Sequence, residues 1–111
     1  MGACTMSIAL THPDAKIRIE DLADGRRRVT VVPQKHTYIP RASCETSYPL
    51  NLIQLILDIK GPEYLCDEIA RTEDPEYVRR DLETYLLAYF DRVDLTIREC
   101  SISVAVAAHR P

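Results

Sequence analysis

The stretch KIRIEDLADGRRRVTVVPQ, residues 16–34, decides the fold. Apolar and polar residues alternate on both sides of Asp24-Gly25, which is typical of strands with one buried face. Asp-Gly is a common hairpin turn because both central positions tolerate a positive φ. We therefore predict a β-hairpin. Its buried face is Ile17, Ile19, Val29 and Val31, and its outward face is Arg18, Glu20, Arg28 and Thr30.

Two short helices are predicted after the hairpin. Ser47 is the expected cap of the first, with Pro49 in its first turn and Gly61-Pro62 as its end. Its inward residues, at helical spacing, are Leu52, Leu55, Ile56 and Ile59. The second helix is PEYLCDEIAR, residues 62–71, with Leu65, Cys66 and Ile69 inward.

A third helix is predicted in EDPEYVRRDLETYLLAYF, residues 73–90. Asp74 is its expected cap, and Pro75 takes the first position, where a missing N–H costs nothing. Its expected buried residues are Val78, Leu82, Tyr85, Leu86 and Tyr89. The sequence therefore predicts an α+β fold, with an N-terminal β-hairpin, three short helices and a C-terminal strand-like segment.

Composition indicates one small globular unit. The chain has 111 residues, of which 46% are hydrophobic and 28% charged, and its net charge of -3 gives no overall attraction to nucleic acid or anionic membrane. No apolar run reaches the roughly 20 residues of a membrane span. We expect a cytoplasmic protein.

The four cysteines, Cys4, Cys44, Cys66 and Cys100, lie far apart in the sequence. No C-x-x-C pair and no histidine at ligand spacing accompanies them, so neither a zinc site nor a redox motif is indicated. We expect free thiols in a reducing compartment.

Several charged groups are candidate functional residues. Arg26, Arg27 and Arg28 could clamp a phosphate, but a basic cluster beside a turn is more often a solvated strand edge. His36 lies in the extended stretch between Pro33 and Pro40 and is expected to be surface decoration. The acidic groups considered for metal or acid–base chemistry are Glu63 with Asp67 and Glu68, and Asp81 with Glu83.

Those acidic spacings do not place two carboxylates and a histidine on one helix face, so we favour solvated helix surface. We assign no catalytic, cofactor-binding or metal-binding residue. A helix-turn-helix with residues 75–90 as the reading helix is a further alternative. Its acidic residues argue against DNA binding, because phosphate contacts need a basic surface.

The segment RASCETSYPLNLIQLILDIKGPEYLCDEIARTEDPEYV, residues 41–78, resembles the segment ahead of the catalytic domain in a group of bacterial class I S-adenosylmethionine-dependent methyltransferases. The similarity extends to RIEDLADGRRRVTVVP, residues 18–33. The resemblance implies that a strand and a glycine-rich loop, V-L-D-x-G-C-G-x-G, should follow. The chain has RECSISVAVAAHRP, residues 98–111, instead.

A shift of reading frame accounts for this difference. In the neighbouring phase, codons for residues 99–109 can spell V-L-D-F-G-C-G-S-G-A, with Ser103, Ala105 and Ala107 standing where glycines are expected. We therefore expect a flexible N-terminus (1–15), a hairpin and helical domain (16–90) and an out-of-frame tail (91–111). Alternatively, residues 94–108 form a genuine β-strand with Leu95, Ile97, Ile102, Val104 and Val106 as its apolar residues.

The resemblance implies a non-catalytic N-terminal fragment of a methyltransferase. S-adenosylmethionine would be the cofactor of the intact relatives and not of this chain. Their methyl acceptor, a small molecule or an unknown group, could contact Tyr38, Tyr48 or Tyr64 in a lid or acceptor-selecting segment. The alternatives are a free-standing interaction or dimerisation domain with exposed apolar surface, and a helix-turn-helix regulator.

Overall fold

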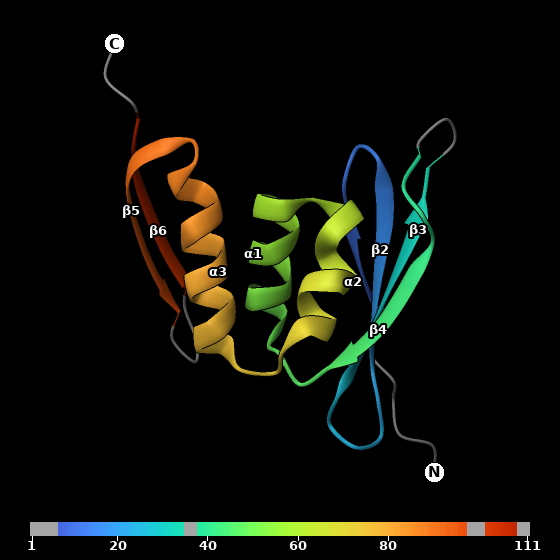
Figure 1. Ribbon diagram of the computed structural model, residues 1–111. Coiled ribbons are helices and arrows are strands. Elements are labelled where there is room, and N and C mark those ends of the chain that lie inside the picture. Colours follow the sequence, from blue (N-terminus) through green and yellow to red (C-terminus); the bar gives the residue numbers. More distant parts are fainter. Residues whose placement is uncertain (1–6, 35–37, 98–101, 109–111) are drawn as a thin grey trace.

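The computed structural model describes residues 7–34, 38–97 and 102–108. Its fold is α+β, as predicted: a four-stranded sheet comes first, three helices follow, and a two-stranded sheet ends the chain (Figure 1). The first sheet is antiparallel, in the order β1 (Ser7–Thr11), β2 (Ala15–Asp21), β3 (Arg27–Pro33) and β4 (Ala42–Thr46).

The expected hairpin is the β2–β3 pair. Ile17 lies opposite Val31 and Ile19 opposite Val29, and all four side chains are buried, as predicted. Cross-strand partners share one face of the sheet, so this register puts the apolar set of both strands on the core side. The turn contains Gly25, whose φ of +84° lies in the region that glycine enters without strain.

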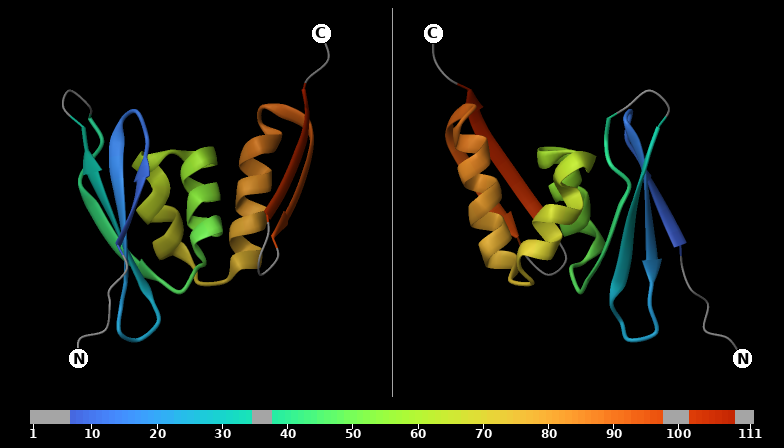
Figure 2. Two further views of the ribbon diagram at one scale, coloured as in Figure 1. Left: turned by 180° about the vertical axis from the view of Figure 1, so that it is seen from behind. Right: turned by 45° about the vertical axis from the view of Figure 1, so that its right-hand side comes forward.

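The three helices are α1 (Leu50–Lys60), α2 (Pro62–Arg71) and α3 (Pro75–Leu87). Helix α2 packs on β3 and β4, α1 lies between α2 and α3, and the last sheet packs against the far side of α3 (Figures 1 and 2). The molecule is therefore a row of layers, and its longest dimension is 59 Å. The apolar residues of α1 and α2 complete the core over the first sheet.

The helix ends follow the sequence signals in two of three cases. Asp74 caps α3 by accepting a hydrogen bond of 3.0 Å from the Glu76 N–H. Gly61 alone separates α1 from α2, and its N–H donates to the Leu57 carbonyl oxygen at 2.9 Å. The Ser47 cap is wrong: Pro49 is the N-cap of α1 and no side chain bonds there. A residue before proline is held in extended conformation, so the helix cannot begin earlier.

The inward faces of the helices differ from the prediction at four positions, and the first is Ile59 of α1, which is only partly buried. Val78 and Leu82 of α3 are buried as expected, but Tyr85 and Leu86 are only partly buried. Tyr89 is 59% exposed because α3 ends at Leu87, before the helical spacing can turn this ring inward.

Three strands were missed. Residues 7–11, expected within a flexible N-terminus, form β1 and pair with β2. Strand β4 was not anticipated between the hairpin and the helices. In the tail, the single strand considered over 94–108 is instead an antiparallel pair, β5 (Phe90–Ile97) and β6 (Ile102–Ala108). Leu95 is its one buried residue among those described, whereas Val104 and Val106 are each 44% exposed.

Candidate functional site

Four charged side chains meet where the end of α1 faces α2 and α3, and we call them the charged cluster: Lys60, Glu68, Arg71 and Asp81. Lys60 Nζ lies 3.3 Å from Glu68 Oε1 and 3.3 Å from Asp81 Oδ2. Arg71 Nη1 lies 3.4 Å from the same Asp81 oxygen and 3.9 Å from Glu68 Oε1. Two cations therefore hold two carboxylates contributed by different helices.

Glu68 is the most deeply buried member of the charged cluster. Its side chain is 2% exposed, and its Oε2 atom has no hydrogen-bond partner. Burial, followed by the neighbouring Asp81 carboxylate, raises the pKa of Glu68 despite the opposing effect of Lys60. The expectation that Glu68 lies on solvated helix surface is therefore wrong, because α1 and α3 cover this side of α2.

The pKa of Asp81 is shifted in the opposite direction. Burial alone would raise its pKa, but hydrogen bonds from Glu68 and Lys60 and the charge of Arg71 together lower the pKa of Asp81. The Glu68 carboxyl therefore keeps its proton to a higher pH than the Asp81 carboxyl does, because two like charges this close are costly when both are ionised.

An aromatic pair adjoins the charged cluster. Lys60 Nζ lies 4.7 Å from the centre of the Tyr85 ring, a cation–π distance. The Tyr85 ring in turn packs against the Tyr89 ring, with 5.7 Å between the ring centres and an interplanar angle of 54°. The lysine is thus held between two carboxylates and a ring, which fixes its position at the end of α1.

A cavity of about 280 Å³ lies against α3 beside the charged cluster. It is lined by Tyr77, Arg80, Asp81 and Thr84, so Asp81 belongs to both features. The Asp81 carboxylate already accepts hydrogen bonds from Lys60 and Arg71. The Thr84 hydroxyl donates to the Arg80 carbonyl oxygen at 2.9 Å, so the groups left open to a ligand are the Tyr77 ring and the Arg80 guanidinium. Among the residues described, no group of three or more metal-ligating side chains lies together.

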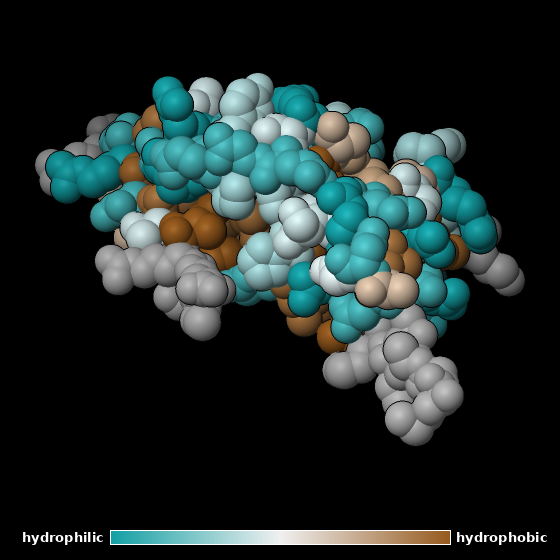
Figure 3. All heavy atoms as spheres, turned by 90° about the horizontal axis from the view of Figure 1, so that it is seen from below, coloured by the Kyte–Doolittle hydropathy of each residue, from teal (hydrophilic) through white to brown (hydrophobic). Residues whose placement is uncertain are grey.

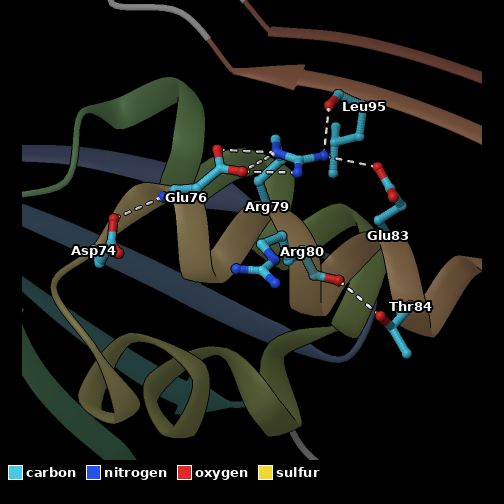
Figure 4. A network of polar contacts seen from close by, with 7 residues as sticks. All are labelled: Asp74, Glu76, Arg79, Arg80, Glu83, Thr84 and Leu95. Atoms are coloured by element: carbon cyan, nitrogen blue, oxygen red, sulfur yellow. Dashed lines mark hydrogen bonds and ion pairs between the residues drawn. The ribbon is translucent and has the colours of Figure 1, made fainter.

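The opposite side of α3 is occupied by its own ion pairs (Figure 4). Arg79 donates to Glu76 at 2.8 Å and to Glu83 at 2.8 Å, and reaches the Leu95 carbonyl oxygen of β5 at 3.4 Å. The charge of Arg79 is therefore balanced within the chain, and its side chain joins α3 to the last sheet. This arrangement gives the helix-turn-helix alternative no additional support.

The arginine triplet of the hairpin is also paired. Arg26 lies 2.6 Å from Glu73, Arg27 lies 3.4 Å from Asp21, and Arg28 lies 3.4 Å from Glu45. Arg27 additionally donates to the Tyr48 carbonyl oxygen at 3.1 Å. These contacts favour the structural interpretation of the triplet over the phosphate clamp.

The three tyrosines considered for substrate contact have different surroundings. Tyr48 is buried, and its hydroxyl donates to the Thr72 carbonyl oxygen at 2.5 Å, so it serves the core and cannot reach a substrate. Burial raises the pKa of Tyr48 to about 12. Tyr38 and Tyr64 are exposed. His36 lies outside the described residues.

Two cysteines that the sequence separates by more than twenty positions meet in the structure. The sulfur atoms of Cys44 on β4 and Cys66 on α2 are 3.0 Å apart. The inward direction of Cys66 was predicted from helical spacing. A prediction of β4 would also have given the direction of Cys44, because Cys44 lies on the side of that strand that faces α2.

No family model, no curated protein and no solved structure matches this chain. Within the described ranges, none of the helices is both long enough and apolar enough to cross a membrane.

Proposed function

We propose that this chain is a non-catalytic N-terminal segment of an S-adenosylmethionine-dependent methyltransferase, read out of frame after Phe90. In the intact relatives the segment would cover the active site or select the methyl acceptor. The sequence resemblance over residues 18–33 and 41–78 is the basis for naming this enzyme class. The exposed apolar side chains at the end of the in-frame part, Leu87 and Tyr89, support the role of a segment that packs against another domain.

The exposure of these two side chains is the observation that carries the proposal. The apolar side chains of β2 and β3 are covered by the helices, whereas at the end of the in-frame part Leu87 and Tyr89 are 45% and 59% exposed. Val104 and Val106 of β6 are also exposed, but they lie in the tail that this proposal places out of frame, so they bear on the contacts of the present chain alone. Figure 3, which views the molecule from below, shows its largest apolar area towards the side that carries β5 and β6 and smaller apolar areas elsewhere. A surface of this kind marks a contact with another domain or chain.

The described residues do not fit a site for the cofactor itself. Both sheets are antiparallel, whereas the class I cofactor-binding fold holds its ligand at the carboxyl ends of parallel strands. Ser103, Ala105 and Ala107, at the places expected for glycine, lie in the exposed strand β6. Each carries a Cβ where the cofactor loop needs close backbone approach. We therefore assign no chemical step to this chain.

Acceptor contact is assigned to the exposed groups beside α2 and α3. Tyr64 is open at the start of α2, and the α3 cavity offers the Tyr77 ring and the Arg80 guanidinium. A ring with a neighbouring charged group can orient a small polar acceptor. Tyr48 is withdrawn from this role because it is buried.

A free-standing dimerisation domain is the second candidate, and the same apolar surface favours it. Among the described residues, neither β5 nor β6 pairs with a third strand, and strand edges can add a second copy. Self-association is expected under both proposals and so does not separate them.

The nucleotide sequence from about codon 85 separates the two proposals. The methyltransferase proposal expects the neighbouring phase to spell the glycine-rich loop and to remain open for roughly another domain's length, about 100–200 codons. A neighbouring phase that spells a different peptide or closes at once would leave the dimerisation domain as the better assignment.

A further inference from the structure

The two thiols of Cys44 and Cys66 form a pair that neither proposed function uses. Their sulfur atoms are 3.0 Å apart, within hydrogen-bond range and about 1 Å longer than a disulfide bond. Each sulfur is held by a regular element, Cys44 by β4 and Cys66 by α2, and these two elements pack directly together. Bond formation therefore needs only a small approach of elements already in contact.

The pair is reachable from one side. Strand β4 is at the edge of the first sheet, and Cys44 on it is partly exposed. Cys66 is 8% exposed, and its sulfur lies 3.9 Å from the Val29 carbonyl oxygen. Solvent therefore meets Cys44 first, with Cys66 directly behind it.

The hydrogen bond between the thiols also eases the loss of the first proton. Donation from Cys44 lowers the pKa of Cys66, although burial opposes this. The same hydrogen bond and burial raise the pKa of Cys44. One proton held between two sulfurs is the state from which thiol–disulfide exchange begins, because the thiolate is the nucleophile.

We propose that Cys44 and Cys66 are a reversible oxidation site, at which a low-molecular-weight disulfide such as oxidised glutathione converts the two thiols into an intrachain disulfide between β4 and α2. This site is independent of the methyltransferase assignment.

The exchange proceeds in two balanced steps. Cys66, whose pKa is the lower, first loses its proton to solvent, and the Cys44 proton then passes along the hydrogen bond to Cys66. The Cys44 thiolate, the sulfur nearer to solvent, attacks one sulfur of oxidised glutathione, which forms a mixed disulfide and releases one glutathione thiolate. Cys66 then loses its proton to solvent, and its thiolate attacks the Cys44 sulfur and releases the second glutathione thiolate. The protein loses two protons and two electrons, and these convert one glutathione disulfide into two glutathione molecules.

The test uses the full chain, equilibrated with oxidised and reduced glutathione, blocked with N-ethylmaleimide and digested with trypsin. Each cysteine falls on a different tryptic peptide, with Cys44 in residues 42–60 and Cys66 in residues 61–71. We expect mass spectrometry to find these two peptides joined within one chain. Dithiothreitol should release them.

The Cys4→Ser/Cys100→Ser variant retains only the proposed pair and should give the same linked peptides. Its thermal midpoint should rise by about 10 °C on oxidation. Cys44→Ser in that background is the matched control, and its midpoint should not change with glutathione disulfide. Should Cys44→Ser fail to fold, the peptide map of the wild-type chain alone still shows whether the Cys44–Cys66 disulfide forms.

Two results would overturn the proposal. One is a map in which Cys44 and Cys66 both remain labelled with N-ethylmaleimide while Cys4 or Cys100 is oxidised. The other is a linkage between Cys44 and Cys66 found only in covalent dimers.

Discussion

At the scale of single residues, Glu68 carries a carboxylate into the interior, and Lys60 is the cation nearest to it. The two groups are 3.3 Å apart, and both side chains are largely buried. Removing one partner of a buried pair leaves the other charge uncompensated, which costs far more than the pair itself contributes. The charged cluster should therefore respond strongly to loss of the lysine.

We expect Lys60→Met to lower the free energy of unfolding by about 3 kcal/mol at pH 7. Methionine retains the length of the side chain and its packing on Tyr85, so the loss reports the charge. The double variant Lys60→Met/Glu68→Gln should recover most of it, because no buried charge is then left alone. Urea unfolding measures all three proteins. A Lys60→Met variant as stable as the wild type would contradict this interpretation of the cluster.

The raised pKa of Glu68 predicts a specific pH dependence. A carboxyl whose pKa is higher in the folded state than its ordinary 4.5 binds its proton more tightly when folded, so its contribution to stability is complete at low pH. That contribution is lost as the pH rises through the pKa that Glu68 has in the folded state. Glu68→Gln cannot lose it, because the amide does not titrate.

The stability of Glu68→Gln relative to the wild type should therefore increase from about pH 4.5 upward and level off above the raised pKa of Glu68. Unfolding curves between pH 4 and pH 8 provide the measurement. A difference between the two proteins that stays constant across this range would show that the carboxyl of Glu68 is not perturbed. Asp81 is present in both proteins, and its lowered pKa acts at more acidic pH.

At the scale of elements, Gly61 decides how α1 and α2 are joined. Its φ of +84° and ψ of 168° belong to a region that is essentially restricted to glycine. No atom lies within 4 Å of a Cβ built at this position, so the cost of a side chain is conformational and not steric.

Gly61→Ala should lower the free energy of unfolding by about 1–3 kcal/mol. Asp67→Ala is a suitable control, because Asp67 is exposed on α2 and its replacement should change stability by less than about 0.5 kcal/mol. Thermal and urea unfolding measure both variants. Equal stability of the two variants would mean that the α1–α2 junction relaxes freely.

Elements whose signals are local were predictable from the sequence. The β2–β3 pair follows from alternation around Asp24-Gly25, and the end of α1 and the cap of α3 follow from Gly61 and Asp74. Strands β1 and β4 were missed because each has five residues and depends on a neighbour for pairing. Whether such a short segment forms a strand depends on its pairing partners in the sheet and not on its own sequence alone.

The candidate site was less predictable for the same reason. Glu68 is acidic and lies in a charged helix, so only the packing of α1 and α3 reveals its burial. The Cys44–Cys66 contact requires β4 and α2 to be placed together, and no spacing in the sequence contains that information. The residues that line the cavity, by contrast, all lie on α3. The sequence does not show which face of that helix the rest of the fold leaves uncovered.

At the scale of the whole molecule, the row of layers leaves its last sheet covered on one side by α3. Strand β6 has no buried residue among those described, and Val104 and Val106 are prominent on its surface. An exposed apolar strand of this kind favours contact with a second copy of the chain.

Replacing both residues, Val104→Thr/Val106→Thr, should reduce concentration-dependent self-association with a change in unfolding free energy of less than about 0.5 kcal/mol. Threonine keeps the preference for a strand and removes apolar surface. Sedimentation velocity over a range of concentrations measures the association. Ile17→Thr, in the buried core, should instead destabilise the fold without a specific effect on association. Unchanged association of the double variant would place the contact surface elsewhere.

Titration calorimetry with S-adenosylmethionine tests the central claim most directly. Two proteins are compared: the 111-residue chain and the product of a gene in which the neighbouring frame is joined after the codon for Phe90. We predict saturable binding to the extended product and none to the 111-residue chain. Binding by the 111-residue chain, or its absence from the extended product, would contradict the account.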